Sequence, residues 1–169
     1  MLYLCSADRP NIFFEVREMP SNVEKWSPIL DDDIEIVRTL GVACDRKVFF
    51  CRSIEMACRL YEYYEDALEK SVYSDPSGGP VPSNRLVAMY HSESAPSVKN
   101  AVSSSLSDPN GVVRRVFATQ SLSMGIHCQN IREVIHWGIP RTLEQYFQEC
   151  GRAGRDNLPA KAMLLHTSA

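Results

Sequence analysis

Short apolar runs alternate with stretches of helical periodicity along most of the chain. The runs, which predict buried strands, lie at 47–51, 86–90, 112–119, 134–137 and 161–166. The helical stretches, in which apolar residues recur every three or four positions, lie at 30–40, 53–68, 94–106 and 142–150. Strands that alternate with helices favour right-handed crossovers. The pattern therefore predicts an α/β fold with a mostly parallel sheet and helices on both faces.

Local signals mark the ends of three of these helices. The stretch at 30–40 is followed by Gly41, and glycine ends helices because it adopts left-handed conformations without strain. Ser53 stands where an N-cap is expected for the next helix, since its hydroxyl accepts a hydrogen bond from a free backbone N–H. Thr142 and Gln145 have the spacing of a capping box for the last helix, and Gly151 is expected to stop it.

Two segments fall outside this alternation. Residues 1–22 are irregular or extended in pattern, and we expect them to form a lead-in to a single domain at 23–169. Residues 71–85 are rich in Ser, Pro and Gly and lack periodicity, which predicts a flexible loop. The run Asp108-Pro109-Asn110-Gly111 is a strong turn signal between the third helix and the third strand.

The composition is that of an ordinary globular domain. Apolar residues make up 44% and charged residues 23% of the 169 positions, which excludes wholesale disorder, collagen-like repeats and a coiled coil. No apolar run is long enough for a membrane span, and the N-terminus lacks the pattern of a secretory signal, so we expect an intracellular protein. None of the six cysteines forms a C-x-x-C pair and no His lies at metal spacing from them, so we expect no zinc site. Without a secretory signal, we expect the cysteines to be reduced thiols.

Charge is distributed unevenly along the chain. The net charge is −3, which lacks the basic excess typical of nucleic-acid-binding domains. Residues 1–110 carry 11 basic and 17 acidic side chains, whereas residues 111–169 carry 7 basic and 4 acidic ones. A site for a polyanion is therefore expected toward the C-terminal third. Three acids near a helix start, Asp31, Asp32 and Asp33, are expected to form a solvated acidic face.

Polar or glycine-containing stretches follow most of the predicted strands. They are Arg52-Ser53, His91, Thr119-Gln120-Ser121 and Gly138-Ile139-Pro140. We expect the Gly/Arg turn after the last helix at the same carboxyl ends. In open parallel sheets the ligand site lies at the carboxyl ends of the strands. We therefore expect these stretches to gather at one edge of the sheet.

The segment QECGRAGRD at 148–156 carries the most distinctive chemistry. Arg152 and Arg155 are three residues apart and flanked by glycines, which let the backbone approach a ligand closely. Guanidinium groups match phosphate oxygens and can stabilise a transferring phosphoryl group. In isolation, the same segment is equally compatible with a basic, solvent-exposed turn at the end of a helix.

Several blocks read together resemble a known family. The sequence ATQSLSMGI at 118–126, VIHWGIPRT at 134–142 and QECGRAGRD at 148–156 resemble motif V, the strand that follows it and motif VI of the RecQ family of superfamily 2 helicases. Upstream, SADRPNI at 6–12 resembles the segment that enters the second RecA-like lobe, and FFCRS at 49–53 resembles motif IV. The resemblance covers essentially the whole chain and implies a RecA-like three-layer sandwich.

The resemblance implies roles at the nucleotide. Arg155 matches the arginine finger that reaches the γ-phosphate, Arg152 matches its phosphate-contacting companion, and Gln148 matches the glutamine that links nucleotide state to DNA contacts. Gly125 and His127 stand where motif V supports nucleotide binding. All of these residues are therefore expected near ATP.

The resemblance also implies contacts to the backbone of single-stranded or forked DNA. Arg52 and Ser53 match the strand-gripping loop of motif IV, and Thr119 and Ser121 match the hydroxyls of motif V. Such contacts reach phosphate and sugar and carry no sequence information.

The same resemblance implies a two-lobe motor. No G-x-x-x-x-G-K-[ST] P-loop occurs in the chain, so ATP and Mg²⁺ are expected to be held mainly by a first RecA-like lobe, in cis or in trans. The implied activity is that of an ATP-dependent 3′→5′ DNA helicase, with a nuclear or chromosomal location. The chain alone is expected to be inactive.

Two other hypotheses remain open. The chain could be a stand-alone or decayed lobe that acts as a nucleic-acid-binding or regulatory module, since Leu122, Ser123 and His127 depart from the usual motif V. An unrelated α/β enzyme is the third possibility, although no nucleophile elbow or Rossmann glycine fingerprint supports it.

Overall fold

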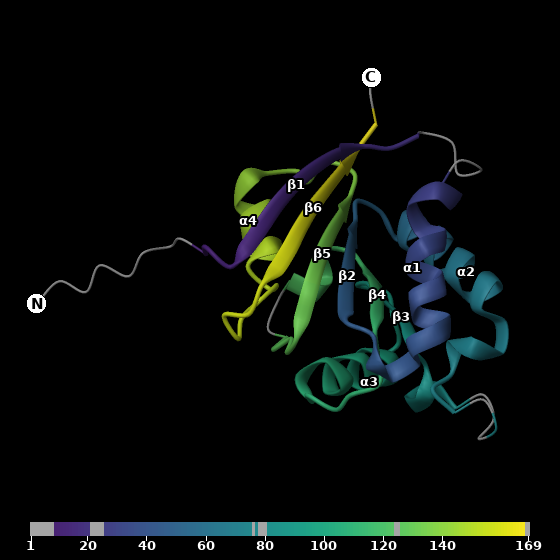
Figure 1. Ribbon diagram of the computed structural model, residues 1–169. Helices are drawn as coiled ribbons and strands as arrows, with labels where there is room; N and C mark the ends of the chain where they lie inside the picture. The colour runs from purple at the N-terminus through teal and green to yellow at the C-terminus, as the bar shows by residue number, and fades with distance from the viewer. Residues whose placement is uncertain (1–8, 21–25, 76, 78–80, 124–125, 168–169) are drawn as a thin grey trace, which may run out of the picture.

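A single parallel sheet organises the molecule in the computed structural model, which describes residues 9–20, 26–75, 77, 81–123 and 126–167. Six strands lie in the order β1-β6-β5-β2-β4-β3, and every neighbouring pair is parallel. The strands are β1 (Ile12–Glu18), β2 (Arg46–Cys51), β3 (Val87–Tyr90), β4 (Arg115–Ala118), β5 (Ile131–Trp137) and β6 (Ala160–His166). All their carboxyl ends point toward the marked C-terminus in Figure 1, as expected for the predicted α/β fold.

Helices cover both faces of this sheet (Figure 1). Strand β2 shows why, because its side chains alternate between two apolar clusters: Phe49 packs with α1 and α2, whereas Val48 and Phe50 pack with α3. The fourth helix, α4, packs through Cys150 on the same face as α3, against β1 and β6. The helices are α1 (Ser27–Leu40), α2 (Ile54–Leu68), α3 (Pro96–Ser107) and α4 (Leu143–Cys150). The three-layer sandwich is thus confirmed.

The N-cap signals at Ser53 and Thr142 act as predicted. The Ser53 and Thr142 hydroxyls accept hydrogen bonds from the backbone N–H three residues on, at 3.2 and 3.1 Å. Gly41 ends α1 with φ +51°, in the left-handed region that favours glycine. Gly151 ends α4 with φ −63°, and the left-handed residue follows three positions later at Gly154, with φ +57°.

The N-terminal segment contributes an edge strand to the sheet. Residues Ile12–Glu18, expected as part of a lead-in at 1–22, form β1 and pair with β6 along their full length, from Ile12 opposite Ala160 to Glu18 opposite His166. The adjacent aromatic residues Phe13 and Phe14 obscure the period-two pattern, because both are substantially exposed at this edge. The sheet therefore already includes residues that precede position 23.

The other strands differ from the sequence expectation mainly at their ends. Strand β4 begins at Arg115, later than the predicted 112, and the Arg114 guanidinium just before it bonds the backbone carbonyls of Val42 and Gly111. Strand β5 begins at Ile131, earlier than the predicted 134. The apolar pattern missed this start because the polar Arg132 and Glu133 lie inside the strand.

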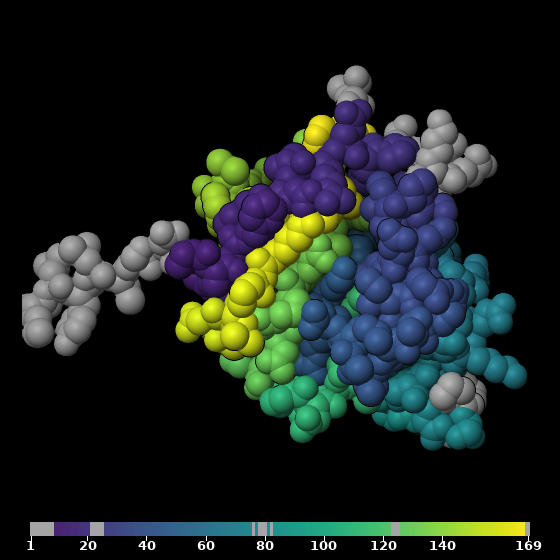
Figure 2. All heavy atoms as spheres, in the orientation of Figure 1, coloured from purple at the N-terminus to yellow at the C-terminus, as the bar shows by residue number. Residues whose placement is uncertain are grey.

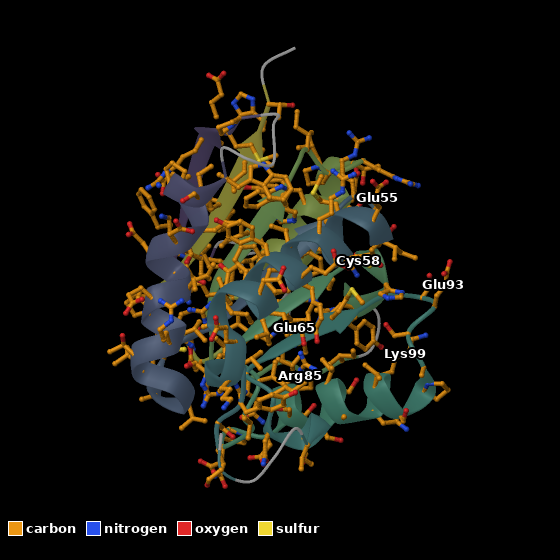
Figure 3. All side chains as sticks on the ribbon, turned by 90° about the vertical axis from the view of Figure 1, so that its right-hand side faces the viewer. Glu55, Cys58, Glu65, Arg85, Glu93 and Lys99 are labelled. Atoms are coloured by element: carbon orange, nitrogen blue, oxygen red, sulfur yellow. The ribbon has the colours of Figure 1, made fainter. Side chains whose placement is uncertain are left out.

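The loop at 71–85 is anchored at both of its ends. Tyr73 forms an antiparallel bridge with Arg85. The Arg85 guanidinium lies 5.4 Å from the ring centres of both Tyr61 and Tyr73 and forms an ion pair with Glu65. Figure 3 shows this anchor beside the free edge of β3, between α2 and α3.

The expectation of a solvated acidic face is partly wrong, because Asp33 is buried. Its carboxylate accepts a hydrogen bond from the Arg115 Nε (2.6 Å) and lies 2.8 Å from the Lys47 Nζ, which also pairs with Glu133 at 2.6 Å. Burial alone would raise the pKa of Asp33, but Arg115 and Lys47 outweigh it and hold the pKa below its usual value. Figure 2 shows that α1 leaves β5 and β6 uncovered on this face. The Lys47 side chain keeps 20% of its surface exposed.

Candidate nucleic-acid interface and arginine turn

A groove lies at the carboxyl ends of β2, β4 and β5, with a volume of about 450 Å³. We call it the strand-end groove. The four residues predicted to contact DNA all line it, and Gly138 and Arg141 lie at the end of β5 beside them. The predicted residues are Arg52, Ser53, Thr119 and Ser121. The structure therefore brings this group together at the sheet edge where it was expected.

Two helix N-termini open next to this groove. Helix α2 begins right after Ser53, and α4 begins right after Thr142, each with its cap hydroxyl already bonded to the backbone. The remaining first-turn N–H groups and the helix dipole favour an anion at such ends. Arg52 and Arg141 are exposed and add two positive charges. The groove thus suits a phosphate far better than the net charge of the chain suggests.

Gly138 sets the position of the Arg52 side chain. Its φ is +99°, and a Cβ built there would lie 3.3 Å from the Arg52 Cδ. The stem of Arg52 therefore rests on a surface that only glycine leaves open. On the far wall, the hydroxyls of Thr119 and Ser121 lie 3.1 Å apart, so one of them donates to the other and keeps further hydrogen-bonding capacity.

The floor of the groove holds a buried acid that the sequence reading assigned no role. Glu149 is fully buried; its Oε2 lies 2.8 Å from His136 Nε2, and its Oε1 accepts a hydrogen bond from the Gln145 side chain at 3.0 Å. The His136 ring stacks on Phe50, with 5.6 Å between ring centres. A histidine inside an apolar strand and a glutamate before a helix end were the available signals, but nothing in the sequence pairs them.

The second group of predicted residues lies elsewhere. The segment at 151–156, which we call the arginine turn, was expected at the carboxyl ends of the strands, and this placement was wrong. The Gly154 N–H donates to the carbonyl of Ile131, the first residue of β5, at 2.9 Å, and the chain then enters β6 at Ala160. A helix between parallel strands runs back across the sheet, so the turn that follows it lies at the amino ends.

The two arginines of this turn are in different environments. Arg152 is buried, and its Nη1 donates to the Ile126 carbonyl at 3.0 Å, so it fastens the turn to the segment that precedes β5. Arg155 is exposed, and its Nε donates to the Gly151 carbonyl at 3.4 Å. Of the pair, Arg155 is the one that presents its guanidinium to solvent.

Three predicted residues remain: Gln148, His127 and Gly125. Gln148 is exposed on α4, between the strand-end groove and the arginine turn. His127 is exposed before β5, and its carbonyl accepts a hydrogen bond from Ser107 at 2.9 Å. Gly125 lies outside the described residues.

Within the described part of the chain, no group of three or more His, Cys, Asp or Glu side chains is arranged to hold a metal ion. Across the same residues, no helix combines the length and apolar character of a membrane span.

The sequence is similar to known helicases. A family model described as the helicase conserved C-terminal domain matches residues 43–157. The ATP-dependent DNA helicase RecQ of Pasteurella multocida is 32% identical over 99% of this chain, and that of Haemophilus influenzae is 30% identical over 99%. The chain spans only 22% and 23% of these two proteins.

The fold is also found in solved helicase structures. The DUF1998 helicase MrfA, crystallised with DNA, superposes with a TM-score of 0.69 at 15% identity, over 93% of this chain and 21% of that one. At this identity the likeness shows the fold alone.

Proposed function

The chain belongs to the helicase conserved C-terminal domain family, and on that premise we propose that it is the C-terminal motor lobe of a RecQ-type ATP-dependent 3′→5′ DNA helicase. The strand-end groove carries the proposal. Residues from motif IV and motif V, nearly seventy positions apart, converge there beside two helix N-termini.

In this proposal the groove binds the backbone of single-stranded or forked DNA. Arg52 supplies charge, Ser53 and the start of α2 supply hydrogen-bond donors, and the hydroxyls of Thr119 and Ser121 reach phosphate or sugar. None of these groups distinguishes one base from another, which suits a motor that must move along any sequence. Arg141, at the end of β5, adds a further phosphate contact.

The arginine turn serves the nucleotide. Arg155, exposed at the amino ends of the strands, is the arginine finger that neutralises charge on the γ-phosphate. Arg152 instead holds the turn in place through Ile126, so the proposal assigns it an anchoring role ahead of phosphate contact. Gln148 lies on the helix between the two regions and reports on nucleotide state.

ATP and Mg²⁺ are held mainly by a first RecA-like lobe, in cis or in trans. The bound nucleotide supplies the free energy of hydrolysis, and this chain supplies the guanidinium that completes its phosphate site. Because the chain has no P-loop, it does not hydrolyse ATP by itself. The location is that of the DNA substrate, nuclear or chromosomal.

A second candidate is a stand-alone lobe that binds nucleic acid or regulates another helicase. The departures from the usual motif V at Leu122, Ser123 and His127 favour this candidate. The strand-end groove can bind phosphate without a bound nucleotide, so such a module would keep its affinity for nucleic acid. It predicts that DNA affinity of the isolated chain is the functional property, with steep salt dependence.

The test is ATP turnover in a protein that contains this chain together with a P-loop lobe. Arg155→Ala is expected to lower DNA-stimulated hydrolysis about 10³-fold or more while DNA affinity stays the same. Arg59→Ala is the control, since Arg59 is an exposed arginine on α2 that forms an ion pair with Glu55 on the same helix. Unchanged turnover in Arg155→Ala would rule out the motor role and leave the stand-alone module.

A further inference from the structure

The N-terminal segment, residues 9–18, holds the arginine turn through side-chain hydrogen bonds from Arg9 and Asn11. The guanidinium of Arg9 donates to three carbonyls of the turn's backbone: Nη1 to Gly151 at 3.3 Å, and Nη2 to Ala153 and Gly154, both at 2.8 Å. Arg9 precedes these residues by more than 140 positions in sequence. One side chain therefore bonds three carbonyls of the turn, and those of Gly151 and Gly154 also accept other hydrogen bonds.

Asn11 continues the same grip. The Asn11 Nδ2 donates to the backbone carbonyls of Gly154 at 2.8 Å and Leu158 at 2.9 Å. The backbone carbonyl of Asn11 accepts a hydrogen bond from the Ala160 N–H at 2.9 Å. The Arg9 Nε donates to Asn11 Oδ1 at 3.4 Å, which links the two side chains. We call Arg9 and Asn11 the clamp.

The clamp fits because of one glycine. At Gly154, with φ +57°, a Cβ would overlap the Asn11 Nδ2. A side chain there would push Asn11 away as well as strain the backbone. The close approach of the N-terminal segment and the left-handed turn thus depend on the same residue.

Charge makes this grip strong. Hydrogen bonds donated by a guanidinium are roughly twice as strong as those between neutral groups, and its planar fork fixes direction as well as distance. The carbonyls of Gly151, Ala153 and Gly154 belong to the residues immediately before Arg155, and Gly151 also accepts the Arg155 Nε. The clamp therefore fixes the backbone just before Arg155, together with the bond from Arg152 to Ile126. The ion pair between Arg132 and Asp156 holds the residue just after Arg155.

We propose that Arg9 and Asn11 are positioning residues for Arg155: they hold the arginine turn in the orientation in which Arg155 meets a phosphate, and they tie that orientation to the position of the N-terminal segment. The proposal rests on the proposed function for the role of Arg155, whereas the clamp itself rests on geometry. A displacement of the N-terminal segment would release the turn without disturbing the strand-end groove.

The first measurement is amide hydrogen exchange on the full 169-residue chain. Arg9→Lys keeps the charge but replaces the fork with a single ammonium group, so we expect the Gly154 and Asn157 amides, which are hydrogen-bonded within and beside the turn, to exchange at least about tenfold faster. Amides in β2 and β5 should be unchanged. Arg17→Ala is the matched control, because Arg17 lies on the same segment and forms an ion pair with the neighbouring Glu15.

The second measurement is ATP turnover in a protein that contains this chain with a P-loop lobe. Arg9→Lys and Asn11→Ala should lower kcat about 10- to 100-fold, with the KM for ATP and the DNA affinity unchanged, because a misplaced guanidinium fails only in the transition state. A purely structural clamp would instead lower thermal stability and leave kcat per folded molecule intact, and that result would overturn the proposal.

The two proposals fail in distinguishable ways. If Arg155→Ala is inactive and Arg9→Lys turns over normally, the clamp does not position Arg155. If Arg155→Ala turns over normally, the motor role fails, and the exchange of the Gly154 amide still decides whether the clamp holds the turn. Uniformly faster exchange throughout the sheet in Arg9→Lys would contradict a local grip.

Discussion

The strand-end groove and the arginine turn are built in opposite ways. The groove consists of residues that directly follow buried strands, held by the Ser53 cap and by the packing of Arg52 on Gly138 at the end of the adjacent strand β5. The arginine turn is held by Arg9 and Asn11, from the other end of the chain, and by Ile126. The groove is therefore a local consequence of the sheet, whereas the turn depends on contacts between distant segments.

Helix α4 connects the two regions. Its N-cap Thr142 lies beside the groove, and its C-cap Gly151 is the first residue of the arginine turn. Near its end, the Glu149 side chain reaches His136 in the groove floor, while the Glu149 carbonyl accepts the Arg152 N–H at 3.1 Å. A short rigid helix thus separates a locally determined site from one that distant contacts can move.

The largest expected effect is a loss of stability that should leave the structures of both the groove and the arginine turn unchanged. Asp33→Asn leaves Arg115 and Lys47 with one charged partner fewer in a buried network, and we expect a loss of about 3–5 kcal/mol in unfolding free energy at neutral pH. Urea denaturation measures it. The groove and the turn should both survive in the folded fraction, since Asp33 lies in neither of them.

The same residue predicts a pH dependence. Because the pKa of Asp33 is lowered on folding, its contribution is present above its ordinary pKa of 3.8 and is lost as the pH falls through the lower, folded value. The pKa of Lys47 is raised despite burial, by Asp33 and Glu133, so its contribution is lost only as the pH rises above 10.5. The Asp33→Asn variant should show a flatter acid limb of stability, and an identical limb would contradict this assignment.

The second prediction separates the turn from ordinary glycine strain. Gly154→Ala introduces both a left-handed alanine and a Cβ that would overlap the Nδ2 of the clamp residue Asn11, so we expect a loss of about 2–4 kcal/mol. Gly41→Ala has a similar φ of +51° and nothing within 4 Å, so it should cost only the backbone strain, about 1–3 kcal/mol. Urea midpoints measure both losses. If the two variants lose the same stability, Asn11 makes no close contact with residue 154.

Most of the fold was accessible from sequence because the signals are local. The caps at Ser53 and Thr142 and the buried run at 47–51 fall where the structure has them. The groove residues followed from the rule that parallel strands end together. The arginine turn was misplaced because the helix before it reverses the chain direction. The clamp was invisible, since no local pattern indicates that Arg9 meets Gly154.

The third prediction tests whether the two regions are independent. Arg52→Ala should weaken binding of single-stranded DNA to the isolated chain about three- to tenfold and reduce the salt slope by about one, because one phosphate contact is lost. Arg9→Lys should leave both quantities unchanged. Fluorescence anisotropy across a salt series measures them, and a parallel loss in Arg9→Lys would show that the clamp also shapes the groove.

The smallest effect should come from Gly138→Ala, which leaves every charge in the groove in place. Its Cβ would lie 3.3 Å from the Arg52 Cδ in a residue with φ +99°, so the Arg52 stem must shift. We expect DNA affinity to fall about two- to threefold with an unchanged salt slope, since the guanidinium remains but is misaligned. In the Arg52→Ala background the same substitution should have no further effect on affinity. Additive losses would mean that Gly138 acts on the groove by a route other than Arg52.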